Sequence, residues 1–375
     1  MDKTKEQSSC CSTGKATGNE TCCCTQPKSN KPISVPWIIA QIDTPVGKIP
    51  QIATRLLFQD ILGTWKARWN INRMDYQVSP GLYAVGYPNQ ESPVLVSANY
   101  KMSFDRLRRE LDGLNLWILV LDTKGVNVWC AAGKGTFGTR ELITRIVLTK
   151  LAEVVSHRRL ILPQLGAPGV SAHKVSTIAG FTVLYGPVRA TDIPAYLKAG
   201  MKATPAMREV RFGFWDRLVL TPIELVGTLK PALIIFGVLS VINIIFRGSL
   251  TAYHLLSKTW ADFLPFLGAA LVGTVLVPVF LPVIPGRALA WKGWLLGLLW
   301  AGVYLLVFLS NVNWVQIATY LLLLPPIGSF LAMNFTGSTT YTSLSGVVKE
   351  MSIVVPAQII SAGLGILFMI GGLFV

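Results

Sequence analysis

Cysteine and acidic residues are scarce in this chain of 375 residues. Five of the six cysteines lie in the first 24 residues, at positions 10, 11 and 22–24, so that Cys130 is the only cysteine in the rest of the sequence. Because an iron–sulfur cluster is held by several cysteine thiolates, the folded part cannot hold a cluster of its own. The N-terminal spacing matches neither a zinc site nor an iron–sulfur site. We interpret residues 1–36, which are polar, as a disordered, cysteine-rich tail that either binds soft metals or is dispensable.

The shortage of acidic residues leaves a formal net charge of +15, from 34 Lys and Arg against 19 Asp and Glu. The cations are scattered and gather before the first apolar run, rather than along a stripe with stacking aromatic residues. This distribution argues against a nucleic-acid partner and favours anionic membrane lipid. Aromatic and basic residues mix over Met207–Leu220, which predicts a helix lying at the membrane interface within an amphipathic linker, residues 206–228.

Long apolar runs dominate the last part of the chain, residues 229–375. About 20 apolar residues cross a bilayer, so these runs predict an all-α transmembrane domain of five helices. No ionisable residue is expected near the centre of a span, so anchoring is the default role of this domain. The polar N-terminus shows no secretion signal, and basic residues precede the first run, so we expect a multi-pass protein of the cytoplasmic (inner) membrane with its N-terminal domain in the cytoplasm. The predicted spans are 229–246, 260–284, 289–309, 314–333 and 353–375.

Residues 37–205 alternate strand and helix patterns. This βαβαβα order predicts an α/β domain with a parallel sheet and helices on both faces. A helix capped by Ser103 is expected to leave Arg106, Arg108 and Arg109 solvated, whereas residues 65–87 are an irregular or β lead-in. The predicted strands are 94–96, 116–121, 159–162 and 181–185, and the later predicted helices are 139–155, 171–179 and 193–199.

Cys130 directly follows the apolar strand 116–121, at a strand-to-helix crossing where open α/β sheets bind ligands. Small residues surround it at Ala131, Ala132, Gly133 and Gly135, which would allow the backbone to approach a large planar ring. A thiolate is a good ligand for a late first-row metal held in such a ring. The competing interpretation is that Cys130 is a small buried core residue.

Other chemistries fit this segment poorly. Gly133 to Gly138 formally matches a dinucleotide fingerprint, but the glycines start 11 residues after Asp122 and the next strand ends without an acidic residue. A phosphate-binding loop fails because Gly135, rather than Ser or Thr, follows Lys134. A cysteine nucleophile would need a histidine base, and no pattern places His157 or His173 near Cys130.

The eight residues from Asn127 to Lys134, NVWCAAGK, resemble the cap-helix signature of the HgcA family, the membrane-bound corrinoid protein of microbial mercury methylation. Residues from about 80 to 200, including the run from Leu162 to Val170, also resemble the corrinoid-binding domain of the corrinoid iron–sulfur protein. This resemblance implies a Rossmann-like domain in which Cys130 is the lower axial ligand of cobalt. The usual cobalamin signature Asp-x-His-x-x-Gly is absent from the sequence. The implied cofactor-binding residues are Asn127, Val128, Trp129, Cys130, Ala131, Ala132, Gly133, Lys134, Gly166 and Ala167.

The same resemblance implies a corrinoid-dependent methyltransferase, with a cobalamin-type cofactor and inorganic Hg(II) as methyl acceptor. In that scheme the methyl group leaves cobalt with both bonding electrons and yields methylmercury. The implied partners are a ferredoxin with two [4Fe–4S] clusters as reductant, and a methyl donor protein or methyl-folate. Three alternatives remain open: a methyl carrier of one-carbon metabolism without mercury specificity, a membrane receptor or transporter that binds no cobalt, and a membrane domain that conducts mercury species.

Overall fold

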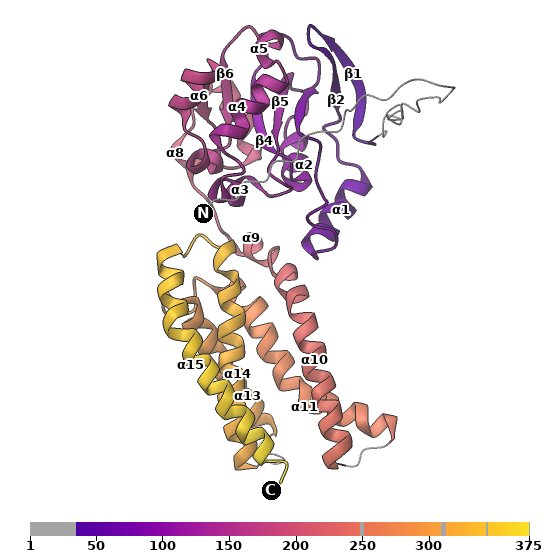
Figure 1. Ribbon diagram of the computed structural model, residues 1–375, viewed down its shortest axis with the longest axis vertical. Helices are drawn as coiled ribbons and strands as arrows, with labels where there is room; N and C mark the ends of the chain where they lie inside the picture. Colours follow the sequence, from indigo (N-terminus) through magenta and orange to yellow (C-terminus); the bar gives the residue numbers. More distant parts are fainter. Residues whose placement is uncertain (1–34, 248–250, 309–312, 343, 375) are drawn as a thin grey trace, which may run out of the picture. The chain divides into compact units, whose positions relative to one another are not determined.

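The computed structural model describes residues 35–247, 251–308, 313–342 and 344–374. The chain divides into residues 1–36 and a unit from Trp37 to Val375. Residues 1–34 of the predicted tail, with its five cysteines, lie outside the described residues. Within the second unit, an α/β domain precedes a set of long apolar helices, as the sequence predicted (Figure 1).

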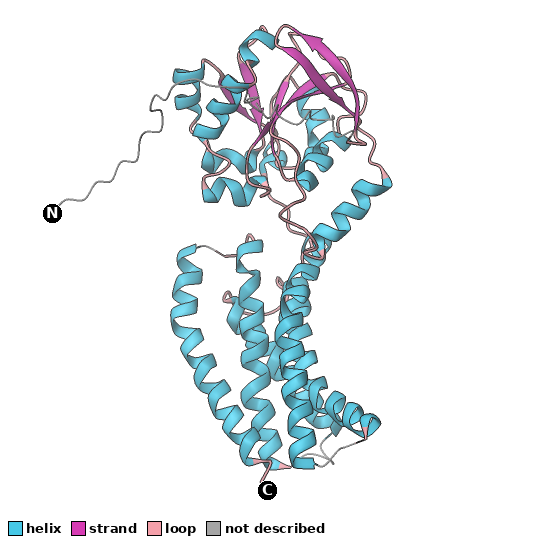
Figure 2. Ribbon diagram, turned by 45° about the vertical axis from the view of Figure 1, so that its right-hand side comes forward, coloured by secondary structure: helices cyan, strands magenta, loops and turns pink. Residues whose placement is uncertain are grey.

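A twisted sheet of seven strands forms the centre of the described α/β domain (Figure 2). The strands are β1 (Ile38–Thr44), β2 (Gly47–Ile52), β3 (Gly81–Val85), β4 (Val94–Ala98), β5 (Leu116–Leu121), β6 (Arg159–Leu162) and β7 (Thr182–Tyr185). Their order in the sheet is β1-β2-β3-β5-β4-β6-β7. Strands β5, β4, β6 and β7 are mutually parallel, whereas β1 pairs with β2, and β3 with β5, in antiparallel fashion. The prediction of a parallel sheet is therefore correct for four strands, and the sheet as a whole is mixed.

Strand β5 is buried along its whole length, because both faces of the sheet are covered. Trp117, Leu119 and Leu121 belong to the main hydrophobic core, together with side chains of the helices that follow the strand. On the other face, Ile118 pairs with Tyr83 of β3. The Tyr83 ring lies 5.4 Å from the ring of Phe104 and 5.8 Å from that of Trp37, measured between centroids. The apolar side chains of β5 thus pack into a core on each face of the sheet.

The predicted helices of this domain are present with shifted ends. They are α2 (Lys101–Arg109), α4 (Thr139–Leu148), α5 (Leu151–Val154), α6 (Ala172–Ala179) and α7 (Ile193–Lys198). Helix α2 begins before Ser103, so the predicted cap at Ser103 is wrong and Tyr100 occupies the cap position. The helix expected over 139–155 breaks at Lys150, whose φ of 47° is left-handed. This break lets Leu151 and Val154 of α5 enter the main core.

The expectation of three solvated arginines on α2 holds for Arg106 and Arg109 and is wrong for Arg108. Arg108 is fully buried in an ion cluster, which we define as Asp60, Lys101, Asp105 and Arg108. Its Nη2 lies 2.6 Å from Asp60 Oδ2 and its Nε lies 2.8 Å from Asp105 Oδ1. The cluster fastens α1 (Phe58–Arg68) to α2. A buried arginine needs such partners, because an uncompensated charge in the interior is strongly destabilising.

The C-terminal part contains five helices that are long and apolar enough to cross a membrane within the described residues: 214–246, 252–280, 289–308, 314–337 and 345–371. The corresponding elements are α10 (Thr221–Arg247), α11 (Ala252–Leu271), η3 (Val272–Leu276), α12 (Val277–Phe280), α13 (Leu289–Phe308), α14 (Trp314–Asn334), η5 (Phe335–Ser338) and α15 (Leu344–Gly371). The first of these spans begins with the short helix α9 (Phe214–Leu218), and the short helix α8 (Pro205–Arg208) precedes it. The orientation in a membrane and the domain boundaries stay predictions.

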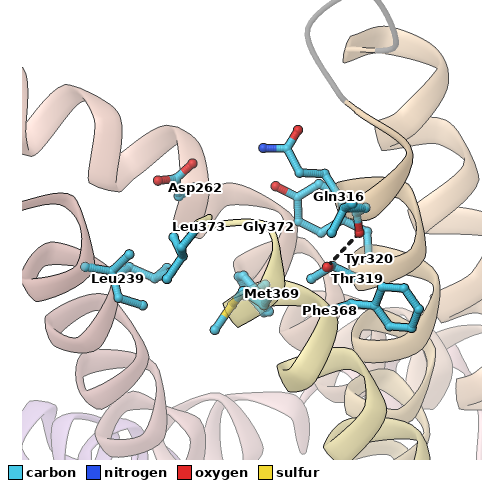
Figure 3. Close-up of a pocket in the computed structure, with 12 residues that line it drawn as sticks. Leu239, Asp262, Gln316, Thr319, Tyr320, Phe368, Met369, Gly372 and Leu373 are labelled. Carbon is cyan, nitrogen blue, oxygen red and sulfur yellow. Dashed lines mark hydrogen bonds between the residues drawn. The ribbon is translucent and has the colours of Figure 1, made fainter. Parts of the chain in front are cut away.

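A polar pair lies well inside the second apolar helix. Because α11 begins at Ala252 rather than near residue 260, Asp262 lies in the middle of this helix and not at its start, so the expectation of no ionisable residue well inside a span is wrong here. The amide Nδ2 of the fully buried Asn243 donates to Asp262 Oδ2 over 3.0 Å. Asp262 also lines a small pocket of about 70 Å³ between α10, α11, α14 and α15, opposite Gln316, Thr319 and Tyr320 (Figure 3).

Candidate functional site at the carboxyl edge of the sheet

The loop that leaves β5 is shaped by one buried side chain, Asn99, which directly follows β4. The Oδ1 of Asn99 accepts hydrogen bonds from the backbone N–H groups of Thr123, at 3.1 Å, and Gly125, at 3.0 Å. Its Nδ2 donates to Gln77 Oε1 at 3.1 Å. Gly125 adopts a φ of 69°, a left-handed conformation that suits glycine. Asn99 therefore ties together the carboxyl ends of two neighbouring parallel strands.

Cys130 lies in the first turn of a short helix, α3 (Val128–Lys134). The side chain of Asn127 caps this helix, because its Oδ1 accepts the backbone N–H of Cys130 at 2.9 Å. The helix ends at Gly135, where φ is 80°. Between strand β5 and about residue 139, the residue pattern alone predicted no helix, whereas the cap-helix resemblance did. A helix separated from β5 by six residues is thus the element that presents Cys130.

Helix α3 packs against η1 (Gln164–Gly169), a 3-10 helix that follows β6. The approach is close: a Cβ at Gly169 would lie 2.1 Å from the carbonyl oxygen of Phe137 and 3.0 Å from Cα of Ala132. A Cβ at Gly166 would lie 2.4 Å from the Phe137 ring. The two separate groups of predicted site residues, 127–134 and 166–167, are therefore brought to the same edge of the sheet.

The predicted cofactor-binding residues differ in how deeply their side chains are buried. Ala131 and Ala132 are buried in the main core, so their small side chains allow α3 to pack on the domain. The side chains of Asn127, Val128, Cys130 and Ala167 are half-buried, and Gly166 is buried. Trp129, Gly133 and Lys134 are exposed. The open positions next to Cys130 are thus Gly133 and Gly135, where an added Cβ would meet no atom within 4 Å.

Cys130 is isolated as a metal donor in the described part of the chain. No group of three or more His, Cys, Asp or Glu side chains that could hold a metal ion is found among these residues. Among these residues, a metal bound at Cys130 would therefore find no set of further protein ligands, and a metal held within a macrocycle needs none. The thiol and the open glycine backbone beside it fit such a group.

The pocket in Figure 3 lies among the apolar helices and includes none of the predicted site residues. Its volume of about 70 Å³ is small, since pockets for drug-sized ligands measure about 300–1,000 Å³. A flat ring resting on an open sheet edge needs no enclosed cavity in the protein. The carboxyl edge, rather than this pocket, is therefore the site that suits a macrocycle.

Reasoning from the sequence missed two residues that shape this edge. Asn99 directly follows β4, as Asp122 directly follows β5. The rule that open α/β sheets bind ligands at the carboxyl ends of their strands could therefore have identified Asn99. Glu141 on α4 accepts the backbone N–H of Asp122 at 2.9 Å and the Nη2 of Arg145 at 2.8 Å. Glu141 lies 19 residues beyond Asp122, so no local sequence pattern predicts the contact between them.

Comparison with known proteins places the similarity in the α/β domain. The family model described as CO dehydrogenase/acetyl-CoA synthase delta subunit matches residues 61–197, which end before the apolar helices. Acetyl-CoA decarbonylase/synthase complex subunit gamma of Archaeoglobus fulgidus is 32% identical over 143 residues, covering 37% of this chain and 30% of that protein. The same subunit of Methanopyrus kandleri is 30% identical over 129 residues, covering 34% of this chain and 27% of that protein.

The large subunit of the corrinoid/iron-sulfur protein of Moorella thermoacetica is 28% identical over 127 residues, covering 33% of this chain and 28% of that protein. The chain thus spans less than a third of the length of each of these relatives. The comparisons support the resemblance of the α/β domain to subunits of corrinoid proteins.

Proposed function

We propose that the α/β domain binds a cobalamin-type cobalt corrinoid at the carboxyl edge of its sheet and acts in methyl transfer to inorganic Hg(II). The observation that carries this proposal is the position of Cys130 in the first turn of α3, beside open glycine backbone and packed on η1. The similarity of this domain to a named corrinoid/iron-sulfur protein supports the choice of cofactor.

The residues of the chain have separate tasks in this proposal. The Cys130 sulfur would hold the metal of the corrinoid, and Asn127 holds the backbone of that residue through its 2.9 Å hydrogen bond. Gly133 places no side chain at an open position one turn from Cys130. A bound methylcorrinoid supplies a methyl group on cobalt. With its electron-rich thiolate, Cys130 would make such a methyl group a better carbanion donor to an electrophile such as Hg(II).

A second candidate function is a methyl carrier of one-carbon metabolism without mercury specificity. It is favoured by the names of the relatives, which are subunits of acetyl-CoA decarbonylase/synthase complexes. It shares the cofactor and Cys130 with the first proposal and differs in the methyl acceptor.

The proposal also requires partners and a location. The described residues hold a single cysteine, so the electrons that re-reduce the cofactor come from another protein, which we take to be a ferredoxin with two [4Fe–4S] clusters. The methyl group comes from a methyl donor protein or methyl-folate. Five apolar helices would anchor the chain in the cytoplasmic membrane, with the α/β domain on the cytoplasmic side.

Corrinoid binding is tested with the full chain in lipid nanodiscs, mixed with hydroxocobalamin and freed of unbound cofactor. We expect the wild type to retain the corrinoid with a visible spectrum shifted by thiolate ligation. Cys130→Ala should lose the shift, and Cys24→Ala, which removes a thiol from the N-terminal tail, should keep it. Identical spectra for all three proteins, or no retained corrinoid, would show that Cys130 is not the cobalt ligand.

The methyl acceptor is tested with methylcobalamin-loaded chain and either Hg(II) or a small thiol. Methylmercury formed by the wild type and absent with Cys130→Ala would support the first proposal. A methyl group passed to the thiol and never to Hg(II) would reject mercury specificity in favour of the carrier.

A further inference from the structure

Helix α1 presents an apolar stripe to its surroundings instead of burying it. An ordinary surface helix turns its apolar side chains towards the core and its polar ones outwards. Here five large apolar side chains, at the i, i+3, i+4, i+7 and i+11 positions, lie on one side of the helix and its last turn and are exposed. The exposed fractions are 76% for Phe58, 47% for Ile61, 42% for Leu62, 62% for Trp65 and 41% for Trp69.

The opposite side of α1 is fastened to the domain. Asp60 and Ala67 are the buried residues of this helix. Asp60 receives the Lys101 Nζ at 2.7 Å and the Arg108 Nη2 at 2.6 Å. At Gly63, an added Cβ would lie only 2.6 Å from the Tyr76 ring. Separating a buried carboxylate from its cationic partners is strongly destabilising. Helix α1 therefore cannot rotate about its axis to bury its stripe.

Two cations flank the stripe. Lys66 is exposed, and Arg68 is half-buried. Long basic side chains beside apolar ones can place their charges at the level of lipid headgroups while their stems lie along apolar surface. The Nη1 of Arg68 also donates to the carbonyl oxygen of Val219 at 3.0 Å, and Val219 lies two residues before α10. The stripe therefore adjoins the beginning of a predicted membrane span.

We propose that α1 is an in-plane membrane helix, whose stripe enters the interface of an anionic lipid bilayer. The combination of tryptophan, aliphatic residues and flanking cations is the composition that such helices share. The net charge of +15 matches an anionic surface, and the hydrogen bond to Val219 places the helix next to a span. This contact holds the α/β domain against the bilayer at a second point, independent of its cofactor.

The test uses the full chain in nanodiscs of phosphatidylcholine and phosphatidylglycerol. The photoreactive residue p-benzoylphenylalanine replaces Trp65 in one protein and Val147 in a control protein. Val147 is 66% exposed on α4, so it matches Trp65 in exposure without belonging to the stripe. After irradiation, mass spectrometry should find phospholipid adducts at position 65 and none at position 147.

A second variant checks that the stripe itself enters the lipid. Phe58→Glu, at a position that is 76% exposed and so tolerant of a charge, should reduce the adduct yield at position 65. Adducts at position 147 equal to those at 65, or no lipid adduct at 65, would overturn the proposal. Crosslinks at 65 that join two copies of the chain, in place of lipid adducts, would assign the stripe to self-association instead.

Discussion

Replacing Gly133 with alanine separates the stability of α3 from its proposed task of receiving a flat cofactor. Gly133 lies inside α3 with helical backbone, and a Cβ there would meet no atom within 4 Å. Glycine in a helix costs about 0.5–1 kcal/mol relative to alanine, because it loses more conformational freedom on folding. Gly133→Ala should therefore stabilise α3 in the cofactor-free protein.

A gain of this size corresponds to roughly two- to fivefold slower amide hydrogen exchange, since RT is about 0.6 kcal/mol. Hydrogen exchange of residues 128–137, measured by mass spectrometry on the cofactor-free full chain, is the assay for this effect. If the corrinoid lies over the exposed side of α3, the added methyl group should at the same time weaken its retention. Gly133→Ala should thus stabilise α3 and weaken retention of the corrinoid.

Gly169→Ala is the matched comparison. Its Cβ would lie 2.1 Å from a backbone oxygen of Phe137, so η1 and α3 must move apart. We expect faster exchange in α3 and lost corrinoid together. The reasoning about the site would be refuted if Gly133→Ala left corrinoid retention unchanged, and the reasoning about packing would be refuted if Gly169→Ala left the exchange of α3 unchanged.

Three further predictions concern the α/β domain. Asn127→Ala removes the cap of α3 and should cost about 0.5–2 kcal/mol, seen as faster hydrogen exchange in that helix. Arg108→Met leaves the buried carboxylates of the ion cluster short of a partner and should destabilise the domain by about 3–5 kcal/mol in urea unfolding, while Arg109→Met, at an exposed position, should not. Burial raises the pKa of Asp60, but hydrogen bonds from Lys101 and a backbone N–H, with nearby cations, outweigh it and hold that pKa below 3.8. The stability from Asp60 is therefore complete above about pH 3.8 and is lost on further acidification, and Asp60→Asn should flatten this acid limb in a circular-dichroism titration.

Local patterns in the sequence predicted several elements correctly. The bounds of β5 and β6 agree with the predicted strands 116–121 and 159–162, because an apolar run between turn residues is a strong local signal. The five apolar helices were found for the same reason, although their ends differ by several residues. The placement of Cys130 after β5 also followed from the sequence alone.

Non-local packing explains what the residue pattern missed. Strand β3 joins the sheet beside β5 in antiparallel fashion, and its short run Gly81–Val85 has no distinctive pattern of its own. Arg108 resembles its exposed neighbours on α2, and only its partner Asp60, 48 positions earlier, makes it a buried residue. The glycine at position 169 is explained by the backbone atoms of Phe137 and Ala132, which approach it from another segment of the chain.

By itself, then, the sequence determined that an α/β domain precedes five long apolar helices, and that Cys130 lies in the segment that follows a buried strand. These properties depend on the pattern of neighbouring residues along the chain, and this pattern is the same in every conformation. The tertiary structure alone decided the mixed sheet, the closeness of α3 to η1 and the outward stripe of α1. Those features depend on which distant segments come together. A charged side chain, for example, can be buried beside an oppositely charged partner, whereas burying it without one strongly destabilises the fold.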